Sequence, residues 1–517
     1  MSSRFAPLSY ERPKGLLKVK GEILIERQIR QLQEAGINDI TLVVGYMKEM
    51  FFYLEEKMNV KIVVNEDYYK YNNTSSLIRV LDKLDDTFIC SSDNYFTQNV
   101  FVETPTEAYY SAEYAEGPTE EYCIETNTED YITNVEIGGK NSWYMIGHVF
   151  FSSEFSKKFK EILKREYNNE ETKEHLWEDL YIRYIKELPM KIKRYESGII
   201  KEFDSLDELR NFDEHYINNT NSNILKNICH ILNCEEKDIC DIKAIKQGLT
   251  NTSFYFSVKK NNELEGKYVY RHPGVGTEDY INRESETFSM NIAKQYNLDD
   301  TFIYMDKEEG WKLSRYIENA HTLDYHNEIE VKSALKMMKT LHDAQIKSNF
   351  DFHIWDKSIE FVNKIKHKGR ADFPDFQELY NMMEQIFQYS EKDGFEKFLC
   401  HCDCYDPNFL IGEDGKMYLI DWEYSGNDDP ASDLGTFVCC SDYTEEETIN
   451  ILEIYAGHPL SDLEKRHYYA YIAIASYYWY VWAIYQTSVG NNVGEYLYIW
   501  YKGAKNYGKK AMKLYNK

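Results

Sequence analysis

The sequence predicts two domains of different fold class, a Rossmann-like α/β domain over residues 1–212 and an α+β bilobal domain over residues 229–517. Residues 1–210 alternate short strand-like and helix-like segments, which is typical of a mostly parallel sheet covered on both faces. Further along, the pattern changes to a few antiparallel strands followed by a long helical region. The polar stretch between the two patterns lacks apolar periodicity, so we expect a linker at residues 213–228.

Length and charge fit this division and narrow the function. A chain of 517 residues holds two to four domains at about 100–200 residues each. Asp and Glu number 87 against 60 Lys and Arg, and the net charge of −27 argues against a general nucleic-acid binder. Phosphorylated small molecules remain compatible, because a few local cations and Mg²⁺ hold those.

No segment of the sequence is expected to enter a membrane. No apolar run approaches the roughly 20 residues needed to span a bilayer, and the N-terminus has no n-region followed by an apolar stretch. Ten cysteines lie scattered in a chain without an export signal, and we expect them to be reduced thiols. The expected compartment is the cytoplasm.

The predicted elements of the first domain place a polar turn at a ligand-binding edge. Polar residues that include Asp93 follow directly after the strand predicted at residues 87–90. In parallel sheets, ligands bind beyond the carboxyl ends of the strands, so we expect this turn to be functional. The preceding elements are predicted helices at 21–35 and 47–57 and predicted strands at 39–44 and 60–65.

The second domain is predicted to contain a small β lobe and a large α lobe. Residues 239–259 and 267–272 are expected to form antiparallel strands with a Gly-containing turn between them. From about residue 328 the chain is predicted to be mainly helical, interrupted by one strand–turn–strand unit at 409–421.

The strongest chemical signal is the segment H-C-D-C-Y-D-P-N at residues 401–408, followed by I-D-W-E at residues 420–423. Phosphoryl transfer needs a carboxylate that orients the attacking hydroxyl and accepts its proton. It also needs an amide and a second carboxylate to hold Mg²⁺ on the phosphates. The spacing H-x-D-x-x-x-x-N, with the second carboxylate after a short hairpin, supplies these groups in order.

On these residues, the chain from about residue 233 onward resembles the choline/ethanolamine kinase group of the aminoglycoside phosphotransferase superfamily. The resemblance implies a protein-kinase-like fold in which Asp403 is the catalytic base. It also implies that Asn408 and Asp421 are Mg²⁺ ligands, with Glu423 as a further one.

The same resemblance implies the ATP-binding residues. The segment Y-V-Y-R at 268–271 is similar to the strand whose cation contacts the α/β-phosphates, with Arg271 where protein kinases carry Lys. Glu286 is the expected ion-pair partner of this cation, and Glu284 is the near alternative. The turn that covers the phosphates is matched by Q-G-L-T-N-T, which places Gly248, Thr250 and Asn251 at the ATP.

The kinase substrate is predicted from aromatic side chains near the C-terminus. On a helix, Trp479 and Trp482 are three residues apart and share a face, and Tyr498 and Tyr501 have the same spacing. A quaternary ammonium cannot donate a hydrogen bond, and aromatic faces attract it through cation–π interactions. Such aromatics could also be core residues, but the W-x-x-W run resembles choline kinases, so we expect a choline cage. Aminoglycoside kinases would instead need an acidic pocket.

Three cysteines alternate with other residues inside the catalytic motif, at Cys400, Cys402 and Cys404. Zinc sites usually use C-x₂-C pairs, so we interpret these cysteines as small side chains rather than metal ligands. Downstream, Asp433 is expected to brace the catalytic loop rather than bind metal.

The first domain carries a second set of motifs. S-S-R-F-A-P-L at residues 2–8, R-P-K at 12–14 and L-K-V at 17–19 resemble the opening of nucleotide–sugar pyrophosphorylases and cytidylyltransferases. Over about residues 1–210 the closest likeness is to bacterial CTP:phosphocholine cytidylyltransferases. This implies that Arg4 and Lys14 neutralise the nucleotide phosphates as pyrophosphate leaves.

The cytidylyltransferase resemblance implies further site residues. Asp93 is an expected Mg²⁺ ligand, and Glu202 and Asp204, on alternate residues of a strand and so on one face, supply a second acidic pair. Trp143 and Trp177 are expected to contribute to a choline cage in this domain. The residues expected to bind CTP are Ser3, Arg4, Lys14, Asn73 and Ser76.

One departure from that family concerns the start of the domain. The family begins with an apolar strand and a glycine-rich turn, whereas this sequence begins inside the turn. We expect the first strand, about five or six residues at the centre of the sheet, to be missing. Its two neighbours would then lack hydrogen bonds, and we expect cytidylyl transfer to be weak or absent while the kinase is intact.

Together the resemblances predict a bifunctional enzyme. A choline kinase would make phosphocholine from choline and ATP, and a cytidylyltransferase would make CDP-choline from phosphocholine and CTP, with Mg²⁺ at both sites. Such fusions resemble bacterial enzymes that supply phosphocholine for surface glycans. Alternatives are an ethanolamine or aminoglycoside kinase, a sugar-1-phosphate nucleotidyltransferase, or a working kinase that carries a non-catalytic scaffold domain. No nucleic-acid partner is expected, and a homodimer stays open.

Overall fold

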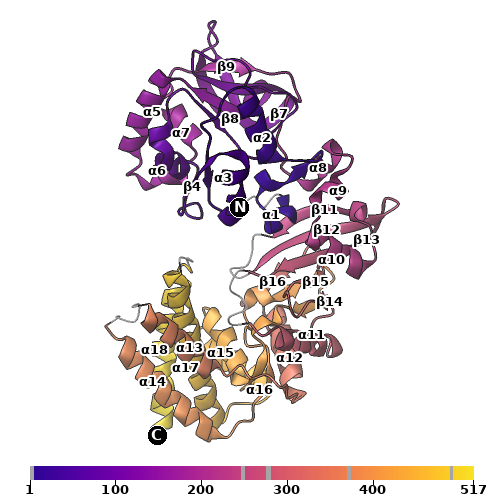
Figure 1. Ribbon diagram of the computed structural model, residues 1–517. Helices are drawn as coiled ribbons and strands as arrows, with labels where there is room; N and C mark the ends of the chain where they lie inside the picture. The colour runs from indigo at the N-terminus through magenta and orange to yellow at the C-terminus, as the bar shows by residue number, and fades with distance from the viewer. Residues whose placement is uncertain (1–4, 246–250, 275–280, 369–373, 490–492) are drawn as a thin grey trace. The chain divides into compact units, whose positions relative to one another are not determined.

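The computed structural model describes residues 5–245, 251–274, 281–368, 374–489 and 493–517 (Figure 1). By its internal contacts the chain divides into two compact units. The first comprises residues 1–244 and 256–265, and the second comprises residues 245–255 and 266–517.

The first unit contains two sheets that together form the α/β domain predicted from the sequence. Strand β3 (Thr41–Val44) pairs in parallel with β4 (Lys61–Val64), and helix α3 (Tyr53–Met58) connects them. The larger sheet has the order β5-β8-β7-β9 and mixes parallel and antiparallel pairs. Its strands are β5 (Thr87–Cys90), β7 (Tyr109–Thr126), β8 (Ile132–Phe151) and β9 (Lys191–Arg194).

Helices and short strand pairs complete this unit. The long hairpin of β7 and β8 explains why the sheet is more mixed than strand–helix alternation predicts, since a direct turn makes neighbouring strands antiparallel. The remaining elements are α1 (Leu8–Glu11), β1 (Lys18–Val19), β2 (Glu22–Ile23), α2 (Leu24–Glu34), α4 (Thr74–Leu77), β6 (Tyr95–Phe96), α5 (Ser153–Glu166), α6 (Glu170–Glu174), α7 (Trp177–Arg183), β10 (Ile200–Lys201) and α8 (Leu206–Phe212).

Strands β3 and β5 each have one unpaired edge. In the described part of the chain, β3 pairs only with β4, and β5 pairs only with β8. Side chains of both strands, among them Leu42 and Phe88, pack in one apolar cluster, yet most residues of both strands are only half-buried. Strands at the centre of such sheets are normally buried on both faces, so these half-buried edges are exposed to a further partner.

The segment predicted to be a linker is mostly helical. It contains α9 (Tyr216–Thr220) and the start of α10 (Asn223–Leu232). The Ser222 hydroxyl caps α10 by accepting a hydrogen bond from the Leu225 N–H, and Glu11 accepts the N–H of Asn223 at 2.6 Å. The buried face of α10 is Ile224, Leu225 and Ile228, an apolar pattern that lies just beyond the polar residues on which the linker prediction rests.

The β lobe of the kinase-like fold is a five-stranded antiparallel sheet. Its order is β11-β12-β13-β15-β14, its first three strands contain residues of both units, and helix α11 (Arg283–Gln295) follows β13. The strands are β11 (Ile239–Ile245), β12 (Thr252–Lys260), β13 (Glu263–His272), β14 (Phe302–Met305) and β15 (Lys312–Arg315). A small β lobe at this place agrees with the sequence prediction.

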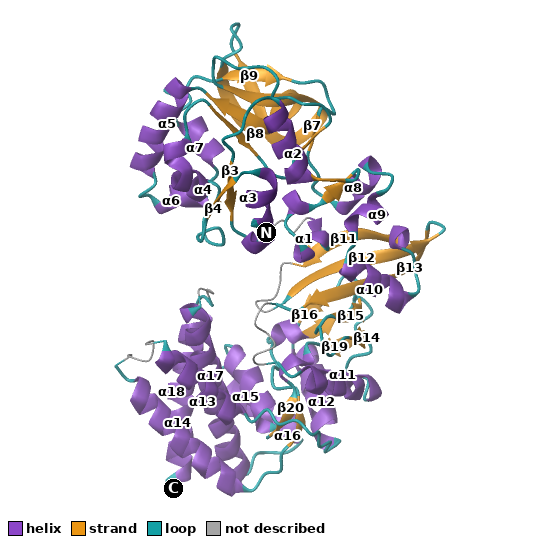
Figure 2. Cartoon of the chain, viewed as in Figure 1, coloured by secondary structure: helices purple, strands orange, loops and turns teal. Residues whose placement is uncertain are grey.

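The rest of the second unit is mainly helical, as predicted (Figure 2). Two small sheets, β17-β20 and β16-β18-β19, position the loops between helices. They consist of β16 (His321–Thr322), β17 (Phe398–Cys400), β18 (Phe409–Ile411), β19 (Met417–Leu419) and β20 (Gly426–Asp428). The helices are α12 (Glu328–Asp343), α13 (Ile354–His367), α14 (Phe376–Ser390), α15 (Ala431–Cys440), α16 (Glu445–Ala456), α17 (Asp462–Ser488) and α18 (Tyr496–Tyr515).

Helix α17 is the centre of the helical core. It packs against α13, α15 and α18, and its residues 467–484 are buried (Figure 1). A capping box of Ser461 and Glu464 fixes its start. Gly435 of α15 lies so close to the backbone of Tyr471 that a Cβ atom would be 2.5 Å from the Tyr471 carbonyl oxygen, so only glycine fits there. Among the described helices, none is both long and apolar enough to cross a membrane.

Candidate active sites

The loop after β17 carries the H-x-D-x-x-x-x-N motif of the second unit. Asp403 is buried, and the side-chain amide of Asn408 donates hydrogen bonds to its Oδ2 atom at 2.9 Å and to its carbonyl oxygen at 2.8 Å. The ring of His401 contacts the carbonyl oxygen of Ile420 at 2.9 Å, which ties this loop to the strand end that carries Asp421. The motif residues predicted from the sequence therefore lie together.

A buried carboxylate holds the loop that carries this motif in place. Asp433 of α15 accepts the backbone N–H of His401 at 3.0 Å and that of Cys402 at 2.6 Å. Its Oδ2 atom also contacts Nε2 of His342 at 2.9 Å, and Nδ1 of His342 contacts the hydroxyl of Tyr455 at 2.8 Å. Burial opposes ionisation of Asp433, but the hydrogen bond and charge of His342 hold its pKa below the usual range.

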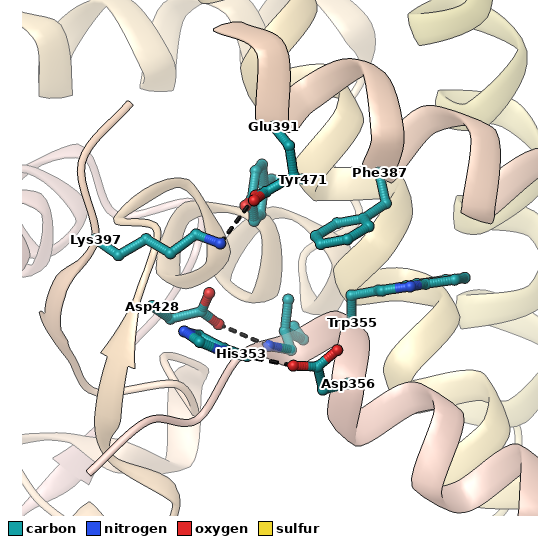
Figure 3. Close-up of a pocket in the computed structure, with 9 residues that line it drawn as sticks. His353, Trp355, Asp356, Phe387, Glu391, Lys397, Asp428 and Tyr471 are labelled. Carbon is teal, nitrogen blue, oxygen red and sulfur yellow. Dashed lines mark hydrogen bonds and ion pairs between the residues drawn. The ribbon is translucent and has the colours of Figure 1, made fainter. Parts of the chain in front are cut away.

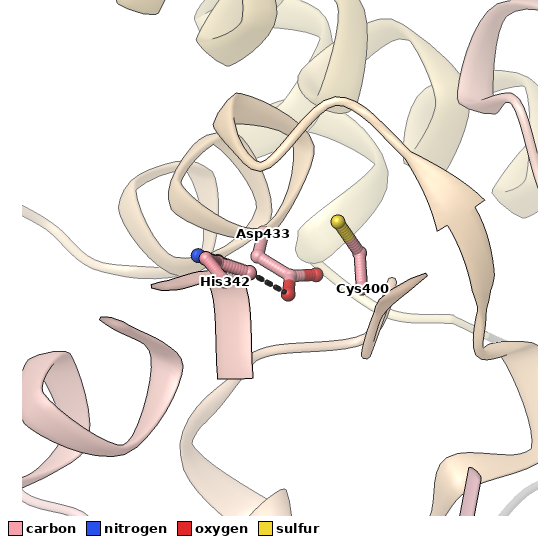
Figure 4. Close-up of side chains that lie close together, drawn as sticks. All are labelled: His342, Cys400 and Asp433. Carbon is pink, nitrogen blue, oxygen red and sulfur yellow. Dashed lines mark hydrogen bonds and ion pairs between the residues drawn. The ribbon is translucent and has the colours of Figure 1, made fainter. Parts of the chain in front are cut away.

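Asp433, His342 and Cys400 lie close enough to hold a metal ion (Figure 4). However, both oxygens of Asp433 already accept hydrogen bonds, and the Cys400 thiol lies 3.4 Å from the carbonyl oxygen of Asp428. The group is therefore a satisfied polar network, which agrees with the prediction that Asp433 braces the loop. Cys402 adopts a left-handed φ of 65°, a conformation that is costly for a non-glycine residue and that the Asp433 hydrogen bond stabilises.

An ion pair and two further acids face this loop. Arg271 contacts Glu286 of α11 at 2.7 Å, Asp421 at 3.2 Å and Glu423 at 3.6 Å. Of the two glutamates considered as the ion-pair partner of Arg271, Glu286 makes the contact, and Glu284 is exposed. The side-chain amide of Asn251 donates to Glu423 Oε2 at 2.9 Å.

The acids in this site are crowded. Burial, and then the charge of Asp421, raise the pKa of Asp403 well above its usual range, and the same two causes raise the pKa of Glu423. A divalent cation would relieve this repulsion, and carboxylate and amide oxygens are the ligands that Mg²⁺ prefers. The residues present therefore fit a Mg²⁺ site.

Three tryptophans form a cluster near this site. Trp479 and Trp482 of α17 have ring centroids 5.6 Å apart, and Trp500 of α18 lies 5.8 Å and 6.4 Å from them. Tyr424, which follows Glu423, contacts Trp479 edge-on at 6.2 Å, so the cluster adjoins the acidic loop. The indole N–H groups of Trp482 and Trp500 are buried without a hydrogen-bond partner among the described residues.

Trp500 was not predicted, whereas the two tyrosines that were predicted lie elsewhere. Tyr498 is 62% exposed and stacks on Tyr501, and the Tyr501 hydroxyl donates a hydrogen bond to Asp375. The buried face of α18 consists of Trp500, Ala504, Gly508 and Ala511. This helical spacing of small residues is the sequence signal that identifies Trp500 as the inward-facing aromatic residue.

A separate cavity of about 200 Å³ lies in the same unit (Figure 3). None of the site residues predicted from the sequence lines it. Its charged groups already have partners, since Glu391 pairs with Lys397 at 2.9 Å and Asp428 accepts the N–H of Ile354 at 2.9 Å. We therefore do not include it in the candidate site.

In the first unit, Lys14 lies between two of the predicted acids. Its Nζ atom is 3.5 Å from Asp93 and 3.4 Å from Asp204. The neighbouring Gly15 packs on the turn that carries Asp93, because a Cβ atom there would lie 2.8 Å from Ser92 Oγ. Glu202 is exposed, yet partial desolvation by the surrounding protein, and then the charge of Asp93, raise its pKa to about 7. Asp93 and Asp204 both act on the pKa of Glu202, so the three carboxylates lie near one another, and their oxygens are the kind of ligand that Mg²⁺ prefers.

A buried acid that the sequence did not reveal positions this cluster. Glu113 of β7 accepts the backbone N–H of Ile200 at 2.9 Å and that of Gly198 at 3.1 Å. These hydrogen bonds hold the start of β10, two residues before Glu202. No local pattern predicts this contact, because Glu113 is an ordinary polar position of a long hairpin.

Of the other residues predicted in the first unit, Asn73 and Trp177 lie together. Asn73 accepts the N–H of Trp177 at 2.7 Å and donates to Glu178 at 3.2 Å. The Trp177 ring is buried and stacks on Tyr110, and the Tyr110 hydroxyl donates to Glu178 at 3.1 Å.

Trp143 and Ser76 have different surroundings. Trp143 contacts Tyr114 edge-on and lies under the guanidinium of Arg194, and no ring contact joins it to Trp177 within the described ranges. Ser76 Oγ accepts a hydrogen bond from Asn65 at 3.1 Å. Four other predicted site residues, Ser3, Arg4, Gly248 and Thr250, lie outside the described residues.

Comparison with protein families matches both parts of the chain. Residues 1–121 match the MobA-like NTP transferase domain, and residues 242–473 match the choline/ethanolamine kinase family. The choline-phosphate cytidylyltransferase of Streptococcus pneumoniae is 32% identical over 214 residues, which is 41% of this chain and 93% of the relative. A 2-aminoethylphosphonate cytidylyltransferase of Lancefieldella rimae is 32% identical over 221 residues, 42% of this chain and 90% of the relative.

For the second part, Protein LicA of Haemophilus influenzae is 25% identical over 241 residues, 44% of this chain and 89% of the relative. Among solved structures, the CTP:phosphocholine cytidylyltransferase of Streptococcus pneumoniae is 32% identical, covers 41% of this chain and 93% of its own, and has a TM-score of 0.40. The choline kinase LicA of Streptococcus pneumoniae is 23% identical, covers 57% and 97%, and has a TM-score of 0.46. By its sequence match to the choline-phosphate cytidylyltransferase, the first part of the chain belongs to that family, and the match of residues 242–473 gives it a fused choline/ethanolamine kinase domain, the bifunctional arrangement that its sequence predicts.

Proposed function

We propose that this enzyme makes CDP-choline in two steps, phosphorylating choline with ATP and then transferring a cytidylyl group from CTP to phosphocholine with release of pyrophosphate. One observation carries the pairing. Choline phosphate, the substrate named for the Streptococcus pneumoniae cytidylyltransferase, is the product that a choline kinase would form. CDP-choline would in turn supply phosphocholine for the decoration of surface glycans.

For the kinase step, Asp403 is proposed to orient the choline hydroxyl and accept its proton. Asn408, Asp421 and Glu423 are the oxygen donors proposed to hold Mg²⁺, which would neutralise charge on the ATP phosphates. The hydrogen bond from Asn408 fixes the Asp403 carboxylate, and the Asp433 brace fixes the loop that carries both. This arrangement is supported by the crowding of acids that a cation would relieve.

We propose that the cluster of Trp479, Trp482 and Trp500 binds the quaternary ammonium group of choline. A quaternary ammonium is attracted to the faces of aromatic rings, and tryptophan gives the strongest such attraction. The cluster adjoins the acidic loop through Tyr424, so a trimethylammonium group held there could present its hydroxyl to Asp403.

For the cytidylyl step, Asp93, Glu202 and Asp204 are proposed to hold Mg²⁺. Lys14, and Arg4 with it, would neutralise the charge that develops on the departing pyrophosphate. The contacts of Lys14 with Asp93 and Asp204 support this placement, because they put a cation at the same position as the metal ligands.

A second acceptor for the cytidylyl step is favoured by one comparison and one contact. The 2-aminoethylphosphonate cytidylyltransferase is as similar to this chain as the choline-phosphate enzyme. Glu178 and the Tyr110 hydroxyl could bind a primary ammonium by hydrogen bonds, which a quaternary ammonium cannot form.

The unpaired edges of β3 and β5 favour a third reading, in which the first unit is a scaffold that carries a working kinase.

The test is to incubate the full chain with Mg²⁺, ATP, CTP and choline and to follow the products by phosphorus NMR. Formation of CDP-choline supports both steps. Phosphocholine that accumulates without CDP-choline supports the kinase and the scaffold reading. If ATP is untouched with choline but consumed with ethanolamine or an aminoglycoside, the choline assignment is wrong. Parallel incubation of CTP with 2-aminoethylphosphonate separates the two cytidylyl acceptors.

A further inference from the structure

Two cations face each other across adjacent strands in the kinase site. In the antiparallel pair of β13 and β15, Arg271 lies directly opposite Lys312. Their side chains are only 7% and 12% exposed. Like charges directly opposite each other destabilise a sheet, and removing them from water adds a further cost. Such a pair needs compensating anions.

A single buried carboxylate compensates part of this charge. Glu286 contacts Arg271 at 2.7 Å, Arg283 at 3.1 Å and Lys312 at 3.3 Å. One carboxylate therefore serves three cations. The remaining negative charge comes from Asp421 and Glu423, which are also the carboxylates proposed to hold Mg²⁺.

The donors of Arg271 are largely used by the protein itself. One terminal nitrogen of its guanidinium bonds Glu286, and the other faces Asp421 and Glu423. The Lys312 ammonium has three donors, and its two contacts, to Glu286 at 3.3 Å and to Asp421 at 4.0 Å, are both long. If Asp421 binds a metal ion, Lys312 would have donors left for another anion.

We propose that Lys312 binds the phosphates of the nucleoside triphosphate beside Arg271, a role that the sequence assigns to Arg271 alone. This inference rests on the proposed kinase function. The anion that completes the site is the polyphosphate chain, which supplies several oxygens close to the metal. Charge-assisted hydrogen bonds to such oxygens are about twice as strong as neutral ones.

The test compares the binding of ATP, ADP, AMP and adenosine, each with Mg²⁺, by calorimetry in Lys312→Met and in the wild-type chain. We expect Lys312→Met to lose about tenfold to a hundredfold in ATP affinity, less in AMP affinity and nothing in adenosine affinity. Lys312→Arg should restore most of the ATP affinity. Lys267→Met is the matched control, since Lys267 lies on β13 and pairs at the surface with Glu318.

Two results would overturn the proposal. Unchanged ATP affinity in a folded Lys312→Met chain would show that Lys312 does not bind phosphate. An equal loss for ATP and adenosine would show that Lys312 only supports the shape of the pocket. If the wild-type chain itself fails to bind ATP with Mg²⁺, the kinase function fails and this inference fails with it, a result distinct from the other two.

Discussion

Asp433 Oδ1 accepts the backbone N–H of Cys402 at 2.6 Å, one residue before Asp403. This contact stabilises a left-handed conformation at Cys402 and thereby sets the direction in which the chain enters Asp403. It depends in turn on His342, which contacts Asp433 from helix α12. The position of Asp403, the proposed catalytic base, therefore depends on Asp433 and His342, which lie on helices outside its loop.

The first prediction concerns this brace. Asp433→Asn replaces one accepting oxygen by an amide that cannot accept an N–H and removes the charge that faces His342. We expect a loss of about 3–5 kcal/mol in the free energy of unfolding, because a buried charge network is broken. We also expect kcat of the kinase to fall while KM for ATP stays nearly constant. Thermal unfolding and steady-state kinetics measure both.

The matched control is Asp442→Asn, which changes an exposed carboxylate in the segment after α15. It should leave stability and kcat unchanged. If Asp433→Asn retains full kcat and stability, the loop does not need the brace.

The second prediction concerns the choline cage. Trp500→Leu keeps an apolar side chain but removes an aromatic face, so we expect KM for choline to rise roughly fivefold to thirtyfold. KM for ethanolamine should change less, because a primary ammonium can still form hydrogen bonds. Tyr498→Leu, on the exposed side of the same helix, is the control. Equal effects of the two substitutions on KM for choline would refute the cage.

The third prediction concerns pH in the first unit. The pKa of Glu202 is raised to about 7, so its carboxylate is protonated below that pH, and a proton then competes with Mg²⁺. We expect Mg²⁺-dependent CTP binding to weaken as the pH falls from 8 to 6, approaching about tenfold per unit below pH 7. Calorimetric titrations at several pH values measure this slope.

Substitution separates Glu202 from other titrating groups. Glu202→Gln should weaken metal-dependent CTP binding and flatten its pH dependence, whereas Glu129→Gln, in an exposed turn, should change neither. A slope that persists in Glu202→Gln would assign the pH dependence to another group.

The fourth prediction concerns the unpaired edges of β3 and β5. An apolar strand followed by a glycine-rich turn, added before residue 1, should pair with both edges and supply backbone N–H groups for the CTP phosphates. We expect cytidylyl transfer from CTP to phosphocholine to rise by at least about tenfold, since such donors stabilise developing charge. An unchanged rate would mean that the edges are irrelevant to the reaction. An added segment of the same length but rich in Gly and Ser is the control.

The sequence predicted those parts of the kinase site that are contiguous in the chain. Asp403 and Asn408 lie in one loop, so their spacing alone places them together, as the hydrogen bond between them shows. Asp421 comes shortly after this loop, at the end of the hairpin of β18 and β19, so its position is also set by the local sequence. The two fold classes were predictable for a similar reason, because periodicity and strand–helix order are local properties.

The residues that were missed depend on contacts between distant elements. Lys312 meets Arg271 only through the register of β13 and β15, and His342 of α12 meets Asp433 of α15 only through a side-chain contact between distant segments. Trp500 could be found only by knowing which face of α18 is buried. The spacing of Tyr498 and Tyr501 suggested a different face of this helix. Glu113 acts on the backbone of β10, which no side-chain pattern reveals.

The central claim, two sites in series joined by phosphocholine, is tested most directly with Asp403→Asn. The variant and the wild-type chain are each incubated with Mg²⁺, ATP and CTP and with either choline or phosphocholine, and the rate of CDP-choline formation is measured. If cytidylyl transfer by the wild-type chain is slow, both chains carry the added N-terminal strand. We expect Asp403→Asn to lose about a hundredfold to ten-thousandfold of the rate from choline and none of the rate from phosphocholine. Equal rates from choline in the two chains, or equal losses from both substrates, would contradict the account.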